Sequence, residues 1–442
     1  HLAKTSGADA IHPGYGFLSE KSSFAQLVQE SGITFIGPSS ESIELMGDKK
    51  SSKIKIQELG VPSIPGYHGD NQDPTHLLEQ AKKIGFPVLI KASGGGGGKG
   101  MRIANHEGEF FDHLASAKRE AMNAFLNDVV LLEKYITQPR HIEVQVMCDL
   151  HGNHFHLFER ECSIQRRYQK IIEESPSTAI SPEIRQSITD AALKITRGID
   201  YLGAGTVEFI LDTDNRFYFL EMNTRLQVEH PVTEMVTGLD LVELQIQVAQ
   251  GLPLNIHDLK QKGHSIEVRI YSEDPDNQFL PSIGKIKRIG LEKKEAHPDE
   301  NSQSIEHPRL DCGYLDGNDV TTSFDPMLAK LIVWAPTRTQ AIEKMLNALD
   351  VYLFLGVKTN RTYLKRILSH PAFAEGQTFT NFIQIYQDDL KPKQKTTTHK
   401  ALAIVAALTH QQNGVSLHKS STCGPHFFQP DVWQTLTRFR NV

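Results

Sequence analysis

Residues 220–230, which read LEMNTRLQVEH, constrain this chain more than any other stretch. If the stretch is extended, its side chains alternate between two faces, one almost wholly apolar and one wholly polar. The polar face carries Glu221, Asn223, Arg225, Gln227 and Glu229. These groups would follow one another at about 6.6 Å, which suits a metal ligand, an anion-binding group and a base along one substrate.

Alternation of this kind most often marks a strand with one solvated face. Here, however, residues 217–220 form a continuous apolar run, as in a buried strand. A solvated face also has no need of carboxylate, amide and guanidinium groups in this order. We therefore favour a functional strand.

A second carboxylate belongs to the same predicted hairpin. Glu208 lies in the strand-like run 206–210, and a turn at residues 212–215 leads to the stretch that contains Glu221. The two carboxylates can meet across the strand pair at about 5 Å. With the amide oxygen of Asn223 they form an all-oxygen set that suits Mg²⁺ or Mn²⁺, and a metal would remove the repulsion between them.

A glycine run at residues 94–98 lies between two short apolar segments, 86–91 and 101–104. A flexible linker has the same composition, but it is seldom held between two strands. We expect a hairpin whose bare backbone approaches phosphates, helped by Lys91 and Lys99. The Walker pattern fails because Gly100 follows Lys99, and the dinucleotide-binding pattern fails because a strand follows the run.

The rest of the chain supplies weaker signals. Strand and helix patterns alternate over residues 8–38, which predicts a parallel α/β layer. Residues 129–136 form a strand that could line an adenine slot. The cationic run 165–170 is as compatible with a solvated surface as with an anionic ligand, and a lone arginine such as Arg269 is most often a surface cation.

Composition bounds the class of protein. A chain of 442 residues is long enough for about three domains, and its formal net charge of −6 argues against a nucleic-acid partner. An apolar run of about 18 residues is missing, which argues against a membrane span. The four cysteines form no CxxC pair and indicate reduced thiols in an intracellular protein. Because the sequence begins with His1, we expect a fragment whose targeting peptide, if any, lies upstream.

The chain resembles the biotin carboxylases of the ATP-grasp superfamily over residues 1–385. The resemblance rests on the strings HPGYGFLSE, IKASGGGGGKGM, PRHIEVQV, QRRYQK, GAGTVEF and EMNTRLQVEHPVTE. It implies an α/β (α+β) chain with an ATP-grasp fold. A truncated N-terminal parallel α/β domain would span residues 1–46, the ATP-grasp domain 47–260 with a lid at about 63–136, and a β-rich C-terminal domain 261–385. Residues 386–442 would be a linker and the start of an incomplete carrier-linking domain.

The resemblance also implies a role for individual residues. Those expected to bind ATP are Lys49, Lys91, Gly96, Gly97, Gly98, Met101, Glu133, Lys134, Ile136, His141, Gln165 and Tyr168. Those expected to hold the metal are Glu208, Glu221 and Asn223, and those expected to bind bicarbonate are Lys170, Arg225, Gln227 and Val228. Biotin would meet Tyr15, Gly16 and Arg269. The catalytic group would be Glu229 as base with Arg225, Lys170 and Arg269. One departure is Tyr168, where the family usually has His at a ribose contact; Tyr can still donate a hydrogen bond.

The implied reaction is ATP-dependent carboxylation of biotin by bicarbonate through carboxyphosphate, as the first half-reaction of an acyl-CoA carboxylase. The string GYHGDNQ and the final residues favour methylcrotonyl-CoA as the acceptor. Acetyl-CoA, propionyl-CoA, pyruvate and urea are alternative acceptors. A carbamoyl-phosphate synthase-like ligase is an alternative enzyme. A non-catalytic scaffold is a further alternative, but it would be expected to have lost a metal carboxylate or the base.

The implied cofactors are ATP, Mg²⁺ or Mn²⁺, and biotin on a separate or missing carrier domain. The implied partners are this carrier, a carboxyltransferase (beta) subunit and further copies of the chain within a larger complex. The expected compartment is the cytoplasm, or the mitochondrial matrix for a eukaryotic source.

Overall fold

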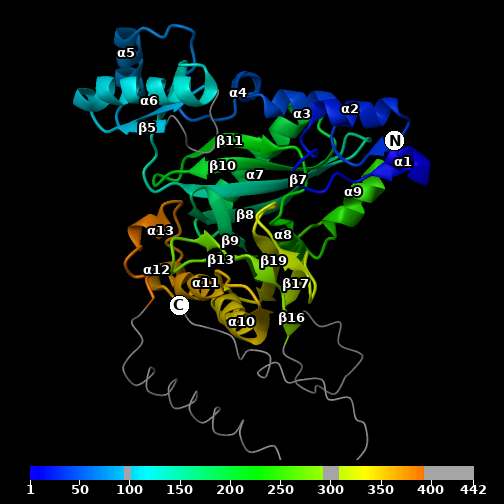
Figure 1. Ribbon diagram of the computed structural model, residues 1–442. Helices are drawn as coiled ribbons and strands as arrows, with labels where there is room; N and C mark the ends of the chain where they lie inside the picture. Colours follow the sequence, from blue (N-terminus) through cyan, green and yellow to red (C-terminus); the bar gives the residue numbers. More distant parts are fainter. Residues whose placement is uncertain (94–100, 292–307, 393–442) are drawn as a thin grey trace, which may run out of the picture. The chain divides into compact units, whose positions relative to one another are not determined.

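The computed structural model describes residues 1–93, 101–291 and 308–392, and residues 1–390 form one compact unit (Figure 1). The predicted lid residues Gly96, Gly97, Gly98 and Lys99 lie outside the described residues, as do residues 393–442 of the predicted linker. The backbone of Lys49 is described, but its side chain is not.

An eight-stranded antiparallel sheet carries the residues of interest, in the order β11-β10-β7-β8-β9-β12-β19-β17. In that order the strands are Phe217–Asn223, Gly203–Leu211, Arg140–Cys148, His154–Arg166, Gln169–Ser175, His264–Tyr271, Met327–Ala335 and Arg309–Cys312. Strand β12 pairs with β9 on one side and β19 on the other, so the sheet continues across the predicted domain boundary at residues 260 and 261.

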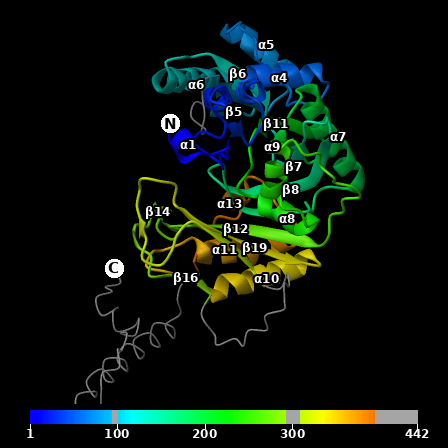
Figure 2. The same ribbon diagram turned by 90° about the vertical axis from the view of Figure 1, so that its right-hand side faces the viewer.

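The two faces of this sheet differ. The helices packed on it include α7 (Pro182–Gly198), α8 (His230–Thr237), α9 (Leu241–Ala249) and α10 (Arg338–Val351). On one face Ile142 of β7 shares a core with Ile188 of α7, and Ile266 of β12 shares a core with Met345 of α10. Figure 2 shows α10 along β12 and β19. Because side chains alternate along a strand, the neighbours of Ile142 and Ile266 point to the opposite face, which we call the polar face.

Local signals explain where the long helices begin. Ser181 accepts a hydrogen bond from the backbone N–H of Ile184 at 3.3 Å, and Pro182 occupies the first turn of α7. Thr337 caps α10 by accepting from the N–H of Gln340 at 3.4 Å. Both caps are local, because the capping residue and the N–H that it accepts from are three positions apart.

A smaller antiparallel sheet has the order β3-β6-β4-β5. Its elements are β3 (Gly66–Tyr67), α5 (Pro74–Ile84), β4 (Val88–Ala92), β5 (Met101–Ala104), η1 (Glu107–Glu109), α6 (Phe110–Phe125) and β6 (Val130–Lys134). Lys91 of β4 lies opposite Met101 of β5. The predicted pairing of the two strands that flank the glycine run is therefore confirmed.

The first residues form a parallel strand pair, β1 (Ala10–Ile11) and β2 (Thr34–Phe35), joined through α2 (Ser22–Glu30). Helix α1 (Leu2–Ser6) precedes them, and α3 (Ser40–Gly47) and α4 (Lys49–Glu58) follow. This arrangement confirms the predicted parallel α/β layer.

The C-terminal part adds three short antiparallel pairs and three helices. The pairs are β13 (Glu273–Asp274) with β14 (Leu280–Pro281), β15 (Gly284–Lys285) with β18 (Asp319–Val320), and β16 (Arg288–Leu291) with β20 (Tyr352–Leu355). The helices are α11 (Arg361–Leu368), α12 (Pro371–Ala374) and α13 (Phe382–Ile385). The helices of the described part include none long and apolar enough to span a membrane.

One prediction was wrong: the stretch 220–230 is not extended throughout. Strand β11 ends at Asn223, the chain bends at Thr224 and Arg225, and helix α8 begins at His230. Two residues explain the change. Leu226 is buried in a core with residues of α9, and the chain therefore leaves the direction of β11. Pro231 occupies the first turn of α8, where its fixed φ favours a helix.

Candidate active site

The ammonium of Lys170 on β9 lies at the centre of the polar face. It contacts a carboxylate oxygen of Glu143, Oε1 of Glu208 at 3.0 Å and Oε1 of Glu229 at 2.8 Å. These carboxylates come from β7, β10 and the residue that precedes α8. Burial lowers the pKa of Lys170, but the three carboxylates outweigh it and raise this pKa well above its usual range. Lys170 is therefore a fixed positive charge.

Glu208 is the most heavily bonded of these carboxylates. It accepts from Nδ2 of Asn223 at 2.6 Å and from Nε2 of Gln227 at 2.7 Å, and it bonds Nε2 of His141 at 2.7 Å. Burial would raise the pKa of Glu208, but Lys170 and His141 hold it well below its usual range. Glu208 therefore stays ionised.

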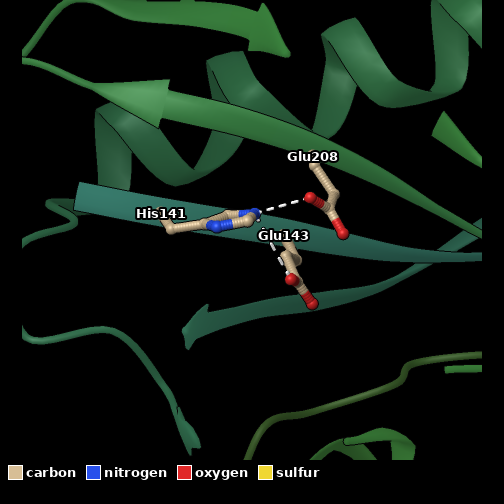
Figure 3. A group of neighbouring side chains, drawn as sticks. All are labelled: His141, Glu143 and Glu208. Atoms are coloured by element: carbon tan, nitrogen blue, oxygen red, sulfur yellow. Dashed lines mark hydrogen bonds and ion pairs between the residues drawn. The ribbon is translucent and has the colours of Figure 1, made fainter. Parts of the chain in front are cut away.

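Figure 3 shows His141, Glu143 and Glu208 pointing toward one another from β7 and β10. Each offers one metal-ligand atom, and these atoms lie within 4.8 Å of one another. A second group of this kind consists of Glu143, Cys162 and Glu229. Burial raises the pKa of Glu143 to about 7 in spite of Lys170.

The predicted metal ligands are only partly brought together. Glu208 and Glu221 are opposite each other across β10 and β11, as predicted, but the side chain of Glu221 is exposed whereas Glu208 is buried. Asn223 directs its amide nitrogen to Glu208, and its Oδ1 accepts from Arg225 at 3.0 Å. In this structure Asn223 therefore turns its amide nitrogen, and not its oxygen, toward Glu208, and its role as a metal ligand stays a prediction.

Glu229 is buried between two cations. Lys170 is 2.8 Å from its Oε1, and a terminal nitrogen of Arg269 is 3.0 Å from its Oε2. Burial would raise the pKa of Glu229, but Lys170, Arg269 and Arg160 hold it well below its usual range. Because the chain bends after Asn223, Glu208 and Glu229 contact the same ammonium.

Arg269 is a buried residue of β12, so its interpretation as a surface cation was wrong. Its Nε donates to Glu173 of β9 at 2.6 Å while its terminal nitrogen reaches Glu229. Arg225 instead bonds Glu20 at 3.0 Å, at the end of the loop that holds Tyr15 and Gly16. Tyr15 is 39% exposed, and Gly16 has a φ of 82°, which favours glycine.

Most of the described residues that are predicted to bind the nucleotide lie on the smaller sheet and on β7 and β8, while Lys49 begins α4 and Tyr168 lies between β8 and β9. Glu133 of β6 is buried and bonds Lys91 at 2.6 Å and Lys53 of α4. Burial would raise its pKa, but Lys91 and Lys53 lower it to about 2. The ammonium of Lys134 donates to the backbone oxygens of residues 85 and 86 at 2.8 and 2.9 Å. Half-buried Met101 begins β5, and half-buried Ile136 follows β6.

The cationic run 165–170 forms the β8–β9 hairpin, and its residues point in different directions. Gln165 donates to Nδ1 of His141 at 2.8 Å, and Lys170 enters the centre. Arg166 pairs with Glu273 at 2.8 Å. Tyr168 lies in the turn and is 72% exposed. Val228, a predicted bicarbonate contact, lies outside this hairpin. Its backbone oxygen accepts from the ammonium of Lys330 at 2.6 Å.

Two central residues escaped the sequence analysis. Glu143 had a usable signal, because His141, Glu143 and Gln145 alternate along β7 as the polar residues of 220–230 do. Arg160 had none: it is fully buried and bonds five side chains, two of them on β7. These are Gln145 (2.7 Å), Thr233 (3.0 Å), Glu143 (3.3 Å), Thr206 (3.2 Å) and Gln227 (2.7 Å).

This sheet, its carboxylates and its buried cations define an ATP-grasp protein. Three family models match the chain: "Biotin carboxylase, N-terminal domain" at residues 1–43, "Carbamoyl-phosphate synthase L chain, ATP binding domain" at 48–257, and "Biotin carboxylase C-terminal domain" at 267–385. The domain boundaries at residues 46, 260 and 385 stay predictions.

Solved structures are similar over most of the chain. The biotin carboxylase domain of a Hydrogenobacter thermophilus 2-oxoglutarate carboxylase, in complex with MgADP, ADP and bicarbonate, is 44% identical with a TM-score of 0.79, covering 89% of this chain and 85% of that one. A Campylobacter jejuni biotin carboxylase complex is 43% identical with a TM-score of 0.78, covering 87% and 83%. The chain belongs to the biotin carboxylase family.

Curated relatives are longer. The methylcrotonoyl-CoA carboxylase alpha subunit of Dictyostelium discoideum is 51% identical over 92% of this chain and 57% of its own length. The corresponding Mus musculus subunit is 45% identical over 100% of this chain and 61% of its own length. The chain therefore spans about three fifths of these relatives.

Proposed function

We propose that this chain carboxylates biotin with bicarbonate at the expense of ATP. The observation that carries the proposal is the position of Glu229, a buried carboxylate held between Lys170 and Arg269. A base flanked by two cations suits a reaction in which an anion must bind and lose a proton at one place.

Glu229 would take the proton of bicarbonate as a bicarbonate oxygen attacks the γ-phosphate of ATP, which yields carboxyphosphate and ADP. In the free protein the two cations hold the pKa of Glu229 well below its usual range, which makes it a weak base. Bicarbonate would compete for Lys170 and Arg269, and each contact withdrawn from Glu229 would increase its basicity. Substrate binding would thereby activate the base.

The phosphates of ATP would meet Lys91 and the predicted lid glycines Gly96, Gly97 and Gly98. The metal would be held by Glu208 and Glu221, which are opposite each other in register, and by Asn223 after its amide turns. The ionised state of Glu208 and the oxygen donors fit Mg²⁺ or Mn²⁺. A divalent ion there would neutralise charge on the transferring phosphoryl group. The remaining predicted nucleotide contacts are those of Lys49, Met101, Glu133, Lys134, Ile136, His141, Gln165 and Tyr168.

Lys170, Arg225, Gln227 and the backbone of Val228 would bind bicarbonate. Arg269 would hold the ureido oxygen of biotin, with Tyr15 and Gly16 at the opposite side. The relatives named methylcrotonoyl-CoA carboxylase support methylcrotonyl-CoA as the acceptor of the whole protein, with a carboxyltransferase beta subunit and a biotin carrier as partners. Relatives named mitochondrial support the matrix as the compartment in a eukaryote.

The test is ADP release by the purified chain with MgATP, in the presence and absence of bicarbonate and of free biotin. We expect release to require bicarbonate and to rise with biotin, with ¹⁴C from bicarbonate appearing in carboxybiotin. ADP release that does not change when bicarbonate or biotin is added would contradict the proposal.

A carbamoyl-phosphate synthase-like ligase is the second candidate, because one family model carries that description. That model covers only the ATP-binding part, whereas the biotin carboxylase C-terminal model includes Arg269. Stimulation of ADP release by ammonia in place of biotin would favour this second candidate.

A further inference from the structure

Two carboxylates on the polar face are buried and incompletely bonded. Glu267 lies on β12, two residues before Arg269, and is 0% exposed. Among the described residues, neither of its oxygens has a hydrogen-bond partner, and Oε2 of Glu173 lacks one as well. Glu173 and Glu267 are directly opposite each other across β9 and β12. Their side chains therefore lie on the same face, with Cβ atoms about 4.5–5.5 Å apart.

Two ionised carboxylates at this position would repel each other with little water to screen them. The nearby cations are already engaged. Arg269 donates to Oε1 of Glu173 at 2.6 Å and to Glu229 at 3.0 Å. Lys330 donates to the backbone oxygen of Val228 at 2.6 Å and pairs with Asp311 at 3.4 Å. Neither cation makes a hydrogen bond to Glu267.

Burial raises the pKa of Glu267 well above its usual range in spite of Lys330, and Glu173 raises it further. The elements packed around the pair are β8, β9, β12, β19, β17 and α8 with its capping residue. Their charged and titratable groups near the pair are Glu173, Arg269, Lys170, Cys162, Lys330, Arg309, Asp311, Glu229, His230 and Glu234.

We propose that Glu267 carries a proton at neutral pH and donates it in a hydrogen bond to Oε2 of Glu173, which makes Glu267 a positioning residue for Arg269. One proton would then satisfy both carboxylates. Glu173 would stay anionic on Nε of Arg269, and the guanidinium would be held with its terminal nitrogen toward Glu229. Ionisation of Glu267 would drive Glu173 away and release Arg269. The effect on turnover rests on the proposed function, but the protonation of Glu267 does not.

The first measurement is independent of activity. Infrared spectra of the full chain at pH 7, wild type minus Glu267→Gln, should show the carbonyl band of a protonated carboxylic acid, and this band should disappear as the pH rises. A difference spectrum without that band at pH 7 would overturn the proposal.

The second measurement compares the pH profiles of biotin carboxylation for wild type, Glu267→Gln and Glu267→Leu. The Gln amide can still donate to Glu173, so this variant should keep wild-type turnover at pH 7 and lose the alkaline decline that Glu267 causes. Leu cannot donate, and we expect a fall of about tenfold or more, chiefly through KM for biotin. Equal loss in both variants, or wild-type profiles in both, would contradict the positioning role. If the wild type does not carboxylate biotin, the proposed function fails while the infrared result still decides the protonation.

Discussion

At the scale of single residues, the site depends on a balance of buried charges. Lys170 and Arg269 together contact Glu143, Glu208, Glu229 and Glu173, all of them buried. A buried ion pair adds little net stability, but removal of one partner leaves an uncompensated charge. Substitutions here should therefore affect both stability and chemistry, and the two effects can be separated by pH and by ligand.

Glu229→Gln should reduce bicarbonate-dependent ATP cleavage by about 10²–10⁴-fold, the usual contribution of a general base. ATP affinity should stay close to wild type, because the hydrogen bonds of the Glu229 carboxylate go to Lys170 and Arg269. Glu221→Gln is the matched comparison and should lose MgATP turnover and affinity, if Glu221 holds the metal. Nucleotide titration with kcat measurement checks both variants. An equal loss of ATP affinity in the two variants would contradict separate roles.

Lys170→Met should destabilise the fold by about 3–5 kcal/mol, because it removes the shared partner of buried carboxylates. Glu208 and Glu229 have a lowered pKa in the folded protein, so the stability they contribute is present above the ordinary Glu pKa and lost as the pH falls through the folded value. The Lys170→Met variant lacks much of this contribution. Its deficit in the free energy of unfolding, relative to wild type, should be largest near pH 7 and shrink below about pH 4.5.

Urea unfolding from about pH 2.5 to pH 8 measures this deficit, because the decline lies below the ordinary Glu pKa. The control is Lys358→Met, which removes an exposed lysine paired with Asp274 at 2.6 Å; its side chain is 69% exposed. That change should cost less than about 1 kcal/mol. A deficit of Lys170→Met that is the same at every pH would contradict the assigned charges.

At the scale of elements, the β8–β9 hairpin is the strained piece of the site. Arg166 pairs with Gln169, so Arg167 and Tyr168 form a two-residue turn, and their φ values are 51° and 67°. Positive φ at both positions is typical of a type I′ turn, which prefers Asn-Gly. Larger residues here carry a conformational cost of about 1–2 kcal/mol each. Such strain is common where a turn presents side chains for function.

The double change Arg167→Asn with Tyr168→Gly should raise the melting temperature, because it relieves this strain. If Tyr168 contacts the nucleotide as the sequence predicts, ATP affinity should fall in the same variant. Arg167→Asn alone is the control and should gain part of the stability with unchanged affinity. Calorimetry measures the melting temperature, and ATP titration measures the affinity. Unchanged ATP affinity in the double variant would contradict a contact between Tyr168 and the nucleotide.

At the scale of the whole molecule, the eight-stranded sheet joins segments that match separate family models. Strands β7 to β11 lie within residues 48–257, whereas β17, β19 and the greater part of β12 lie within 267–385. Ile172 of β9 shares a core with Ile266 of β12 and Leu331 of β19. The Glu173–Arg269–Glu229 contacts cross the same junction. The site is therefore complete only when both segments are folded together.

A chain that ends at residue 262 should not give a soluble folded monomer, because β9 would become an open edge beside an uncovered apolar face. A chain that ends at residue 390 keeps the whole compact unit and should melt like the full chain. Size-exclusion chromatography and circular dichroism of both truncations test this. If the shorter chain is a monomer and melts cooperatively, residues 1–262 fold without the C-terminal strands, and the prediction is wrong.

The sequence by itself determined the local features of this protein. Helix caps such as Ser181, the strand pair around the glycine run and the opposition of Glu208 and Glu221 all depend on residues close in the chain. Local propensity and short turns suffice to predict them. The strings in the sequence also led to the family that the comparisons show.

Only the tertiary structure decided how the centre is assembled. Strand β10 pairs with β7, not only with its neighbour β11, and this non-local pairing places Glu143 beside Glu208. The burial of Leu226 and the start of α8 turn the chain after Asn223 and bring Glu229 to Lys170. Pro231 is a local signal for the start of α8, but the pairing of β10 with β7 and the burial of Leu226 have none, because each depends on distant segments. The strand pattern alone therefore predicted candidate site residues, but not where they meet.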